Sequence, residues 1–246
     1  MFHPKGPTFF ELTHQCFSST ERGYDLLALK FDFTPYRTPD TVLSVVGEHI
    51  KQLASIDKAM DICCGTGAVM QMLRPLCRDL VVGIDFSRGM LEVARQKNEA
   101  AEGRTGLDYI RGNVFKMPFD AKFDLAVCLS ALGHICERDM TRFLDQVAGI
   151  LKPGGRFVFV TSYKPPVWSK NFWFSYAFNA AISVRNMLFR PPFIMYYLTF
   201  ILPGVKILLE NHDFEVEIKE AFEGELSHLR LVTATLRSVG SRGEGL

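Results

Sequence analysis

The chain has 246 residues, which suits one domain with an additional cover. Hydrophobic residues make up 48% of it, enough for a large core, and the net charge of +1 argues against an enzyme acting on nucleic acid. The first residues lack the pattern of a signal peptide, and the longest apolar run, Phe193 to Leu202, is too short to span a bilayer. We therefore expect a cytoplasmic protein.

The cysteines show no spacing typical of a metal site, because the sequence contains no paired C-x-x-C motif. Cys63 and Cys64 are adjacent, and adjacent cysteines do not form an easy disulfide. We expect no metal, and reduced thiols at all six positions: Cys16, Cys63, Cys64, Cys77, Cys128 and Cys136.

Helices and strands are predicted to alternate along the first two thirds of the chain. Apolar residues at helical spacing predict helices over residues 40–53, 68–76, 87–99 and 139–151. Short apolar runs predict strands over residues 58–63, 79–85, 107–111, 123–129 and 156–161. Buried strands that alternate with helices form parallel sheets, so we expect a doubly wound α/β fold with helices on both faces.

The pattern changes near the C-terminus. Phe214, Val216 and Ile218 alternate with charged residues, and a further strand is predicted over residues 228–236. Two strands with no helix between them predict an antiparallel pair at the sheet edge. The complete prediction is a mostly parallel seven-stranded sheet with one antiparallel edge strand, followed by a disordered tail over residues 238–246.

A glycine loop follows the first predicted strand and has the sequence Asp61-Ile62-Cys63-Cys64-Gly65-Thr66-Gly67. Glycines let the backbone approach a ligand closely, and ligands bind beyond the carboxyl ends of such strands. Asp85 ends the next strand, where a carboxylate can accept both hydroxyls of a ribose. A nicotinamide dinucleotide site shares these features, but Met70 stands where its third glycine is needed.

The loop resembles the first motif of class I (Rossmann-like) S-adenosylmethionine-dependent methyltransferases of the small-molecule branch, with Cys63 where the family usually has glycine. Four more segments resemble family motifs in the same order. They are Gly83 to Leu91, Arg111 to Phe119 (with Asn113 in place of the usual aspartate), Phe123 to Ile135, and Leu151 to Gly155. The resemblance covers about residues 40–162, and the C-terminal strand pair agrees with the family's antiparallel edge.

The resemblance implies that the chain binds S-adenosylmethionine and releases S-adenosylhomocysteine. The implied contacts are Asp61, Cys63, Gly65 and Gly67 around the methionine part, Asp85 on the ribose, Phe86 and Met90 flanking the adenine, Asn113 and Val114 on its edge, and Ser130 near the methyl group. Tyr36 is expected to contact the cofactor, because in this family the region before the core folds over it. Tyr24 and Arg37 lie in the same region, and packing or exposure is an equally open interpretation of all three.

Methyl transfer is an in-line displacement, so alignment of donor and acceptor does most of the work. A base is needed only for a weakly acidic hydroxyl or a protonated amine. His134, in the loop after the fourth strand, is the candidate base. The alternative is that His134 orients the loop or touches the cofactor.

Residues 163–206 contain twelve aromatic residues and five basic residues but no aspartate or glutamate. Three interpretations remain open: an apolar acceptor pocket lined by Trp168, Trp173 and Tyr197, a membrane-surface patch, and a subunit interface or extra helical core. The first two are compatible for a quinone- or lipid-like acceptor.

We therefore predict a methyltransferase that acts on a small hydrophobic acceptor, first at oxygen, with carbon and nitrogen open. The predicted parts are an N-terminal cover (residues 1–39), a cofactor-binding half (40–162), an aromatic substrate cover (163–204), a strand pair (205–237) and the tail. A non-catalytic cofactor-binding or partner-binding protein and a nicotinamide-dependent oxidoreductase are the rival functions.

Overall fold

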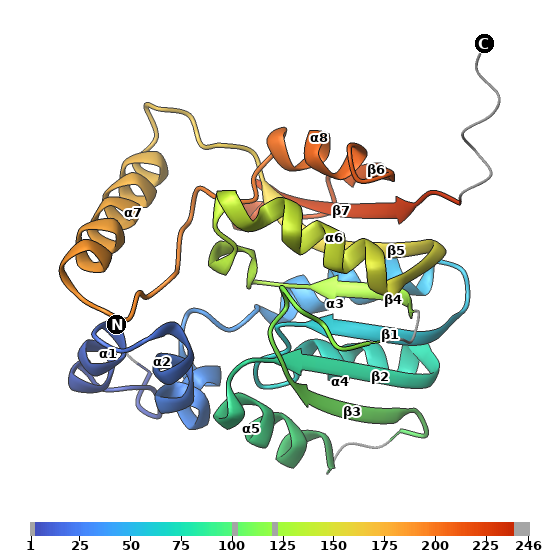
Figure 1. Cartoon of the computed structure of the whole chain (residues 1–246), viewed down its shortest axis with the longest axis horizontal. Coiled ribbons are helices and arrows are strands. Elements are labelled where there is room, and N and C mark those ends of the chain that lie inside the picture. The colour runs from blue at the N-terminus through green and yellow to red at the C-terminus, as the bar shows by residue number, and fades with distance from the viewer. Residues whose placement is uncertain (1–2, 100–102, 120–122, 239–246) are drawn as a thin grey trace.

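The computed structural model describes residues 3–99, 103–119 and 123–238 and contains a seven-stranded sheet (Figure 1). The strands are β1 (Ile56–Ile62), β2 (Cys77–Asp85), β3 (Gly106–Arg111), β4 (Phe123–Cys128), β5 (Leu151–Ser162), β6 (Phe214–Lys219) and β7 (Leu229–Leu236). Their order is β3-β2-β1-β4-β5-β7-β6. The pairs from β3 to β5 are parallel, whereas β7 is antiparallel to both β5 and β6. The predicted fold class is confirmed, and the reversed strand lies one place inside the edge.

The helices are α1 (Phe9–Cys16), α2 (Thr20–Leu27), α3 (Asp40–Lys51), α4 (Ala68–Leu73), α5 (Arg88–Glu99), α6 (Met140–Ile150), α7 (Lys170–Leu188) and α8 (Gly204–Glu210). Of these, α3, α4 and α5 cover one face of the sheet, and α6 and α8 cover the other. Short 3-10 turns are η1 (Ala28–Phe33), η2 (Arg74–Leu76), η3 (Leu132–His134), η4 (Glu137–Asp139) and η5 (Gly224–Leu226). None of the helices in the described part of the chain has the length and hydropathy of a membrane-spanning segment.

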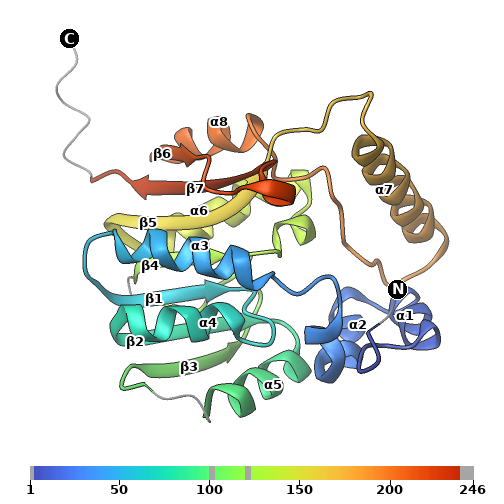
Figure 2. The ribbon, with the colours of Figure 1, turned by 180° about the vertical axis from the view of Figure 1, so that it is seen from behind.

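Two hydrophobic cores lie on opposite faces of the sheet, because successive side chains of a strand point to opposite faces. Met60 and Ile62 of β1 pack with α6 and α8, whereas Ala59 packs with α3, α4 and α5. Figure 2 shows the second layer from its outer side. The sheet is therefore buried on both faces, as the apolar strands predicted.

Local sequence explains where several elements begin and end. Ser87 caps α5, since its hydroxyl accepts a hydrogen bond from the Met90 amide at 3.1 Å. Pro75 limits α4, which gives way to the η2 turn after Leu73. The predicted turn over Pro153-Gly154-Gly155 is instead part of β5, where a shift in register and a φ of 77° at Gly154 mark an irregularity inside the strand.

The two predicted cover segments lie beyond the carboxyl ends of the parallel strands. Figures 1 and 2 show α1, α2 and η1 at this end of the sheet, with α7 next to them and outside both helix layers. The tail predicted to be disordered spans residues 238–246, and all of it except Ser238 lies outside the described residues. All six cysteines are free thiols.

Candidate active site

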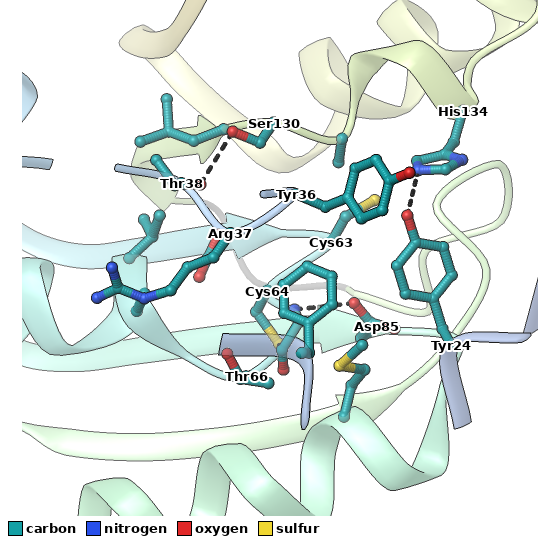
Figure 3. Close-up of a pocket in the computed structure, with 18 of the residues that line it drawn as sticks. Tyr24, Tyr36, Arg37, Thr38, Cys63, Cys64, Thr66, Asp85, Ser130 and His134 are labelled. Atoms are coloured by element: carbon teal, nitrogen blue, oxygen red, sulfur yellow. Dashed lines mark hydrogen bonds between the residues drawn. The ribbon is translucent and has the colours of Figure 1, made fainter. Parts of the chain in front are cut away.

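A cavity of about 360 Å³ lies where the carboxyl ends of the strands meet the N-terminal cover. Its walls come from the loop after β1, the end of β2, the loop after β4, residues 24–39 of the cover, and Met195 and Tyr197 of the aromatic segment (Figure 3). Chain segments far apart in the sequence therefore close over one edge of the sheet.

The loop between β1 and α4 carries three residues in the left-handed region: Cys63 at φ 59°, Gly65 at φ 52° and Gly67 at φ 83°. Gly65 lines the cavity, and a Cβ atom there would meet open space. Gly67 has a different role, because a Cβ atom there would lie 2.8 Å from Nδ2 of Asn98 on α5. One glycine thus leaves room for a ligand, and the other lets α5 approach the loop.

Two buried carboxyl groups line the cavity. The Gly65 amide donates to Oδ2 of Asp85 at 2.9 Å, and the Ser87 amide donates to Oδ1 at 2.8 Å. Burial raises the pKa of Asp85 to about 6. Burial, with the charge of Asp85 added, also raises the pKa of Asp61 well above its usual value. Within the described residues, Oδ2 of Asp61 has no hydrogen-bond partner.

These groups fit S-adenosylmethionine. A buried carboxylate oxygen without a partner is costly unless a ligand supplies a donor or a positive charge, and the ammonium of the methionine part supplies both. Asp85 keeps lone pairs for ribose hydroxyls beyond its two amide donors. The chemistry of the cavity therefore agrees with the cofactor that the loop motif implies.

The N-terminal cover is bonded to the residues around the cavity at two points, one in the loop after β1 and one at the start of α5. Oδ1 of Asp32 accepts the Thr66 hydroxyl at 2.7 Å, while its other oxygen pairs with Lys97 of α5. Oδ1 of Asp25 accepts the Ser87 hydroxyl at 2.6 Å and the Gly89 amide at 2.9 Å. The cover is therefore fixed to the cofactor loop and to the start of α5.

A third cover contact joins Thr38 to Ser130, whose hydroxyls lie 3.0 Å apart (Figure 3). Asp25, Asp32 and Thr38 were missed by sequence reasoning. Their partners lie 34 or more residues away, so no local pattern contains the signal.

Tyr24 and His134 form a hydrogen-bonded pair at the cavity wall, with 2.7 Å between the phenolic oxygen and Nε2 (Figure 3). The other ring nitrogen, Nδ1, lies against the carbonyl oxygen of Ile194, which accepts only. Nδ1 must therefore carry the proton, and Tyr24 donates to Nε2. Burial lowers the pKa of His134 and raises that of Tyr24, so both groups are neutral near pH 7.

Met70 explains why the third glycine of a dinucleotide motif is not needed here. Its side chain is fully buried beneath the loop, and its sulfur lies 2.3 Å from where a Cβ atom of Gly83 would be. Gly83 of β2 thus provides the space that a glycine at position 70 would provide in a dinucleotide site.

Most of the predicted site residues line this cavity. They are Tyr36, Asp61, Cys63, Gly65, Asp85, Phe86, Met90, Ser130, His134 and Tyr197, together with Tyr24 and Arg37. Their roles toward a ligand stay predictions.

Five predicted site residues do not line the cavity. Gly67 packs on α5, and Val114 belongs to the core beside α6. The side-chain oxygen of Asn113 accepts the Phe115 amide at 2.9 Å, so it is used within its own loop. Trp168 is 85% exposed and Trp173 is 59% exposed, both away from the cavity.

Tyr197 connects the cavity to α7. Its ring lies 4.8 Å from the ring of Phe178 and 6.2 Å from that of Phe174, and its amide donates to the Asn179 side chain at 2.9 Å. The same segment is held from the other side, where the Tyr196 amide donates to the Gly133 carbonyl at 2.8 Å. A Cβ atom at Gly133 would lie 2.7 Å from the Tyr196 carbonyl oxygen, so only glycine fits.

The chain is similar in sequence to known methyltransferases. Residues 59–155 match a family model described as a methyltransferase domain. The demethylmenaquinone methyltransferase of Bacillus licheniformis is 30% identical over 176 residues, which cover 65% of this chain and 73% of that protein. The 2-phytyl-1,4-naphtoquinone methyltransferase of Trichormus variabilis is 30% identical over 112 residues, covering 44% of this chain and 48% of that protein.

Solved structures share the fold. The complex of DhpI with S-adenosylhomocysteine superposes with a TM-score of 0.66 at 16% identity, covering 91% of this chain and 98% of DhpI. The N-methyltransferase NodS of Bradyrhizobium japonicum, also with S-adenosylhomocysteine, gives 0.60 at 13% identity, covering 90% and 100%. The sequence relatives, with which the fold agrees, show that the chain belongs to the class I S-adenosylmethionine-dependent methyltransferases.

Proposed function

We propose that the chain transfers a methyl group from S-adenosylmethionine to a hydrophobic acceptor of the quinol or phenol class. The names of its relatives support this class, since they act on demethylmenaquinone and on a phytyl naphthoquinone. The cavity supports it as well, because Phe31, Tyr36 and Tyr197 line it with aromatic rings.

In this proposal the cofactor lies along the loop after β1. Asp61 holds the ammonium of its methionine part, and Asp85 holds the ribose hydroxyls. Phe86 and Met90 flank the adenine. When bound, the cofactor supplies an activated methyl group on a positively charged sulfur. The protein contributes alignment and the exclusion of water, which the bonded cover provides.

The Tyr24–His134 pair is the observation that carries the proposal. An acceptor hydroxyl next to Tyr24 passes its proton to the phenolic oxygen, while the phenolic proton moves to Nε2 of His134. The imidazolium that forms keeps its proton on Nδ1, which goes on donating a hydrogen bond to the Ile194 carbonyl oxygen. His134 therefore acts as the base through Tyr24, for which the sequence suggested only a cofactor contact, packing or exposure.

Loss of the hydroxyl proton makes more than one atom of the acceptor nucleophilic. A quinolate or phenolate carries negative charge on its oxygen and on the conjugated ring carbons. Oxygen is the acceptor that we first expect from the sequence, and the same base serves transfer to a ring carbon. Mass spectrometry and NMR of the product distinguish the two.

The test is methyl transfer to a short-chain demethylated naphthoquinol, kept reduced, with the parent quinone as the comparison acceptor. His134→Gln and Tyr24→Phe should each lower kcat by about 100-fold while leaving the affinity for S-adenosylhomocysteine unchanged. Because burial lowers the pKa of His134, kcat of the unmodified protein should stay constant down to a pH below the usual histidine value of about 6.5 and then fall.

Two results would contradict the proposal. If the cofactor product binds but no quinol or phenol is methylated, the chain is a binding protein or uses another acceptor class. If both variants lose cofactor affinity in proportion to kcat, the pair is structural.

A further inference from the structure

Helix α7 turns the polar side chains of Arg185 and Asn186 inward and carries mostly apolar side chains on its outer face. The buried guanidinium of Arg185 donates to the carbonyl oxygens of Cys16 at 2.9 Å, Ser18 at 2.9 Å and Pro191 at 2.6 Å. On the same side, the Asn186 side chain bonds the backbone of Phe193 through both its oxygen and its nitrogen. Buried hydrogen bonds therefore hold the inner face near the end of α7, beside the buried Ile182.

Every exposed residue of α7 from position 173 to 188 is uncharged. The set is Trp173, Phe174, Tyr176, Ala177, Ala180, Ala181, Ser183, Val184, Met187 and Leu188. Met187 is 75% exposed, Phe174 66% and Leu188 65%. A continuous apolar face of this kind, exposed to water, is typical of an interaction site.

Basic residues flank this face at both ends. Lys164 and Lys170 are exposed before and at the start of α7, and Arg190 is exposed after its end. The whole segment from 163 to 206 contains no acidic residue. Surfaces that meet lipid headgroups typically combine Trp and Tyr with Lys and Arg.

We propose that the outer face of α7, with Lys164, Lys170 and Arg190, docks on an anionic lipid bilayer. A second copy of the chain is a poorer partner. Self-association of this face would bring the basic residues of the two copies together, and the segment has no acidic residue to offset their repulsion. The phosphates of an anionic bilayer supply the missing negative charge.

This surface is continuous with the active site. Phe174 is exposed on α7, yet its ring also contacts Tyr197, which lines the cavity. A hydrophobic acceptor therefore enters the cavity from the bilayer along this edge, an inference that rests on the proposed function. Docking places the cavity mouth near the lipid, and the acceptor need not cross water.

The protein contains its own probe for this contact. Both of its tryptophans are exposed, Trp173 on the outer face of α7 and Trp168 in the segment directly before the helix. Titration with phosphatidylcholine vesicles that contain phosphatidylglycerol should shift the tryptophan emission to shorter wavelength, and brominated lipid should quench it. Vesicles of phosphatidylcholine alone should bind more weakly, and added salt should remove the difference.

Two variants test the two parts of the surface. Val184→Gln with Met187→Gln and Leu188→Gln keeps good helix formers and should lower vesicle binding by about tenfold or more. Lys170→Gln with Arg190→Gln should lower binding to anionic vesicles by about fivefold for each base and leave binding to neutral vesicles unchanged. Ile207→Gln is the matched control, since Ile207 is 57% exposed and belongs to α8, which lies apart from α7 (Figure 1).

The docking proposal fails if the emission does not change with vesicles, or if the Ile207 variant loses as much binding as the α7 variant. It also fails if the emission shifts with protein concentration alone and sedimentation shows a dimer that the α7 variant abolishes, because a second copy then covers the face. Methylation of a water-soluble naphthoquinol without vesicles should be the same for all these variants. Absence of that activity in the unmodified protein is a failure of the proposed function, not of docking.

Discussion

Burial favours the neutral form of the Asp85 carboxyl group, whereas the proposed binding of ribose hydroxyls favours the ionised form. Its pKa is about 6 in the folded protein, whereas an unfolded aspartate titrates near ~3.9. The folded state therefore holds a proton that the unfolded chain has lost between about pH 4 and pH 6. Stability from this group is present at low pH and is lost as pH rises through that window.

Asp85→Asn should therefore stabilise the free protein at pH 8. Ionised Asp85 costs about 3 kcal/mol there, and the variant loses one of two amide hydrogen bonds, worth about 1 kcal/mol, so the net gain is about 1–2 kcal/mol. Thermal unfolding without ligand measures it, with Asp108→Asn on exposed β3 as the control. A gain as large at pH 4 as at pH 8 would contradict the titration argument.

The same substitution should weaken cofactor binding, because the carboxylate is the better acceptor for two ribose hydroxyls. We expect a loss of about 10- to 100-fold in affinity for S-adenosylhomocysteine at pH 8, measured by calorimetric titration. In the unmodified protein the affinity should fall as pH drops through about 6, where Asp85 takes up its proton. Unchanged affinity in the variant would remove Asp85 from the ribose site.

Cys63 stands where the family motif usually has glycine, and its backbone conformation is unfavourable for a residue with a side chain. At φ 59° a side chain costs about 1–2 kcal/mol relative to glycine. Cys63→Gly should keep or raise the urea midpoint of unfolding, whereas Cys63→Val should lower the free energy of unfolding by about 2 kcal/mol, since a β-branched residue fits this region worst. Equal midpoints for the two variants would mean that the loop does not keep this conformation.

At the scale of elements, the sequence predicted best what local patterns determine. Each of the strands and helices predicted between residues 40 and 162 is present, with ends that differ by a few residues. β5 differs most, because the Pro-Gly-Gly segment that is typical of a turn forms an irregularity within the strand. The motif loop and Asp85 were predictable for the same reason, since both follow directly from strand ends.

Contacts between elements were not predictable in this way. The exposure of Trp168 and Trp173 depends on which side of α7 faces the body, and Arg185 and Asn186 decide that through partners in α1 and the 191–193 segment. Apolar composition alone left open whether these side chains line an acceptor pocket, meet a membrane or form a subunit interface. The hydrogen bond from the Phe115 amide to the Asn113 side chain was not predicted either, and the role of Asn113 toward the adenine stays a prediction.

The N-terminal cover offers a prediction at this scale. Asp25→Ala and Asp32→Ala each remove a carboxylate that bonds the cover to the cofactor loop or α5. Limited proteolysis should then cut faster within residues 20–38, and the affinity for S-adenosylhomocysteine should fall by about tenfold. Glu21→Ala is the matched control, because Glu21 forms an exposed pair with Arg111 that contributes little. Equal proteolysis in all three variants would show that other contacts hold the cover.

Across the whole molecule, the cavity joins parts that lie at opposite ends of the sequence. S-adenosylhomocysteine should therefore slow hydrogen exchange in residues 24–38, in the loops after β1 and β4, and around residues 195–197, while β6 and β7 exchange as before. Mass spectrometry of peptic fragments with and without the ligand checks this. Protection confined to the loop after β1 would mean that the cover and the aromatic segment do not enclose the ligand.

The backbone contact between Gly133 and Tyr196 has a consequence for the range of acceptors. Any larger residue at position 133 must move the segment that carries Met195 and Tyr197, because no space for a Cβ atom exists there. Asp61, Asp85 and the loop after β1 lie on other elements and keep their places. Position 133 is thus a natural control of cavity width that is separate from cofactor recognition. Substitutions at this one residue, whether they arise in evolution or by mutagenesis, should change the size of the acceptor that the cavity admits.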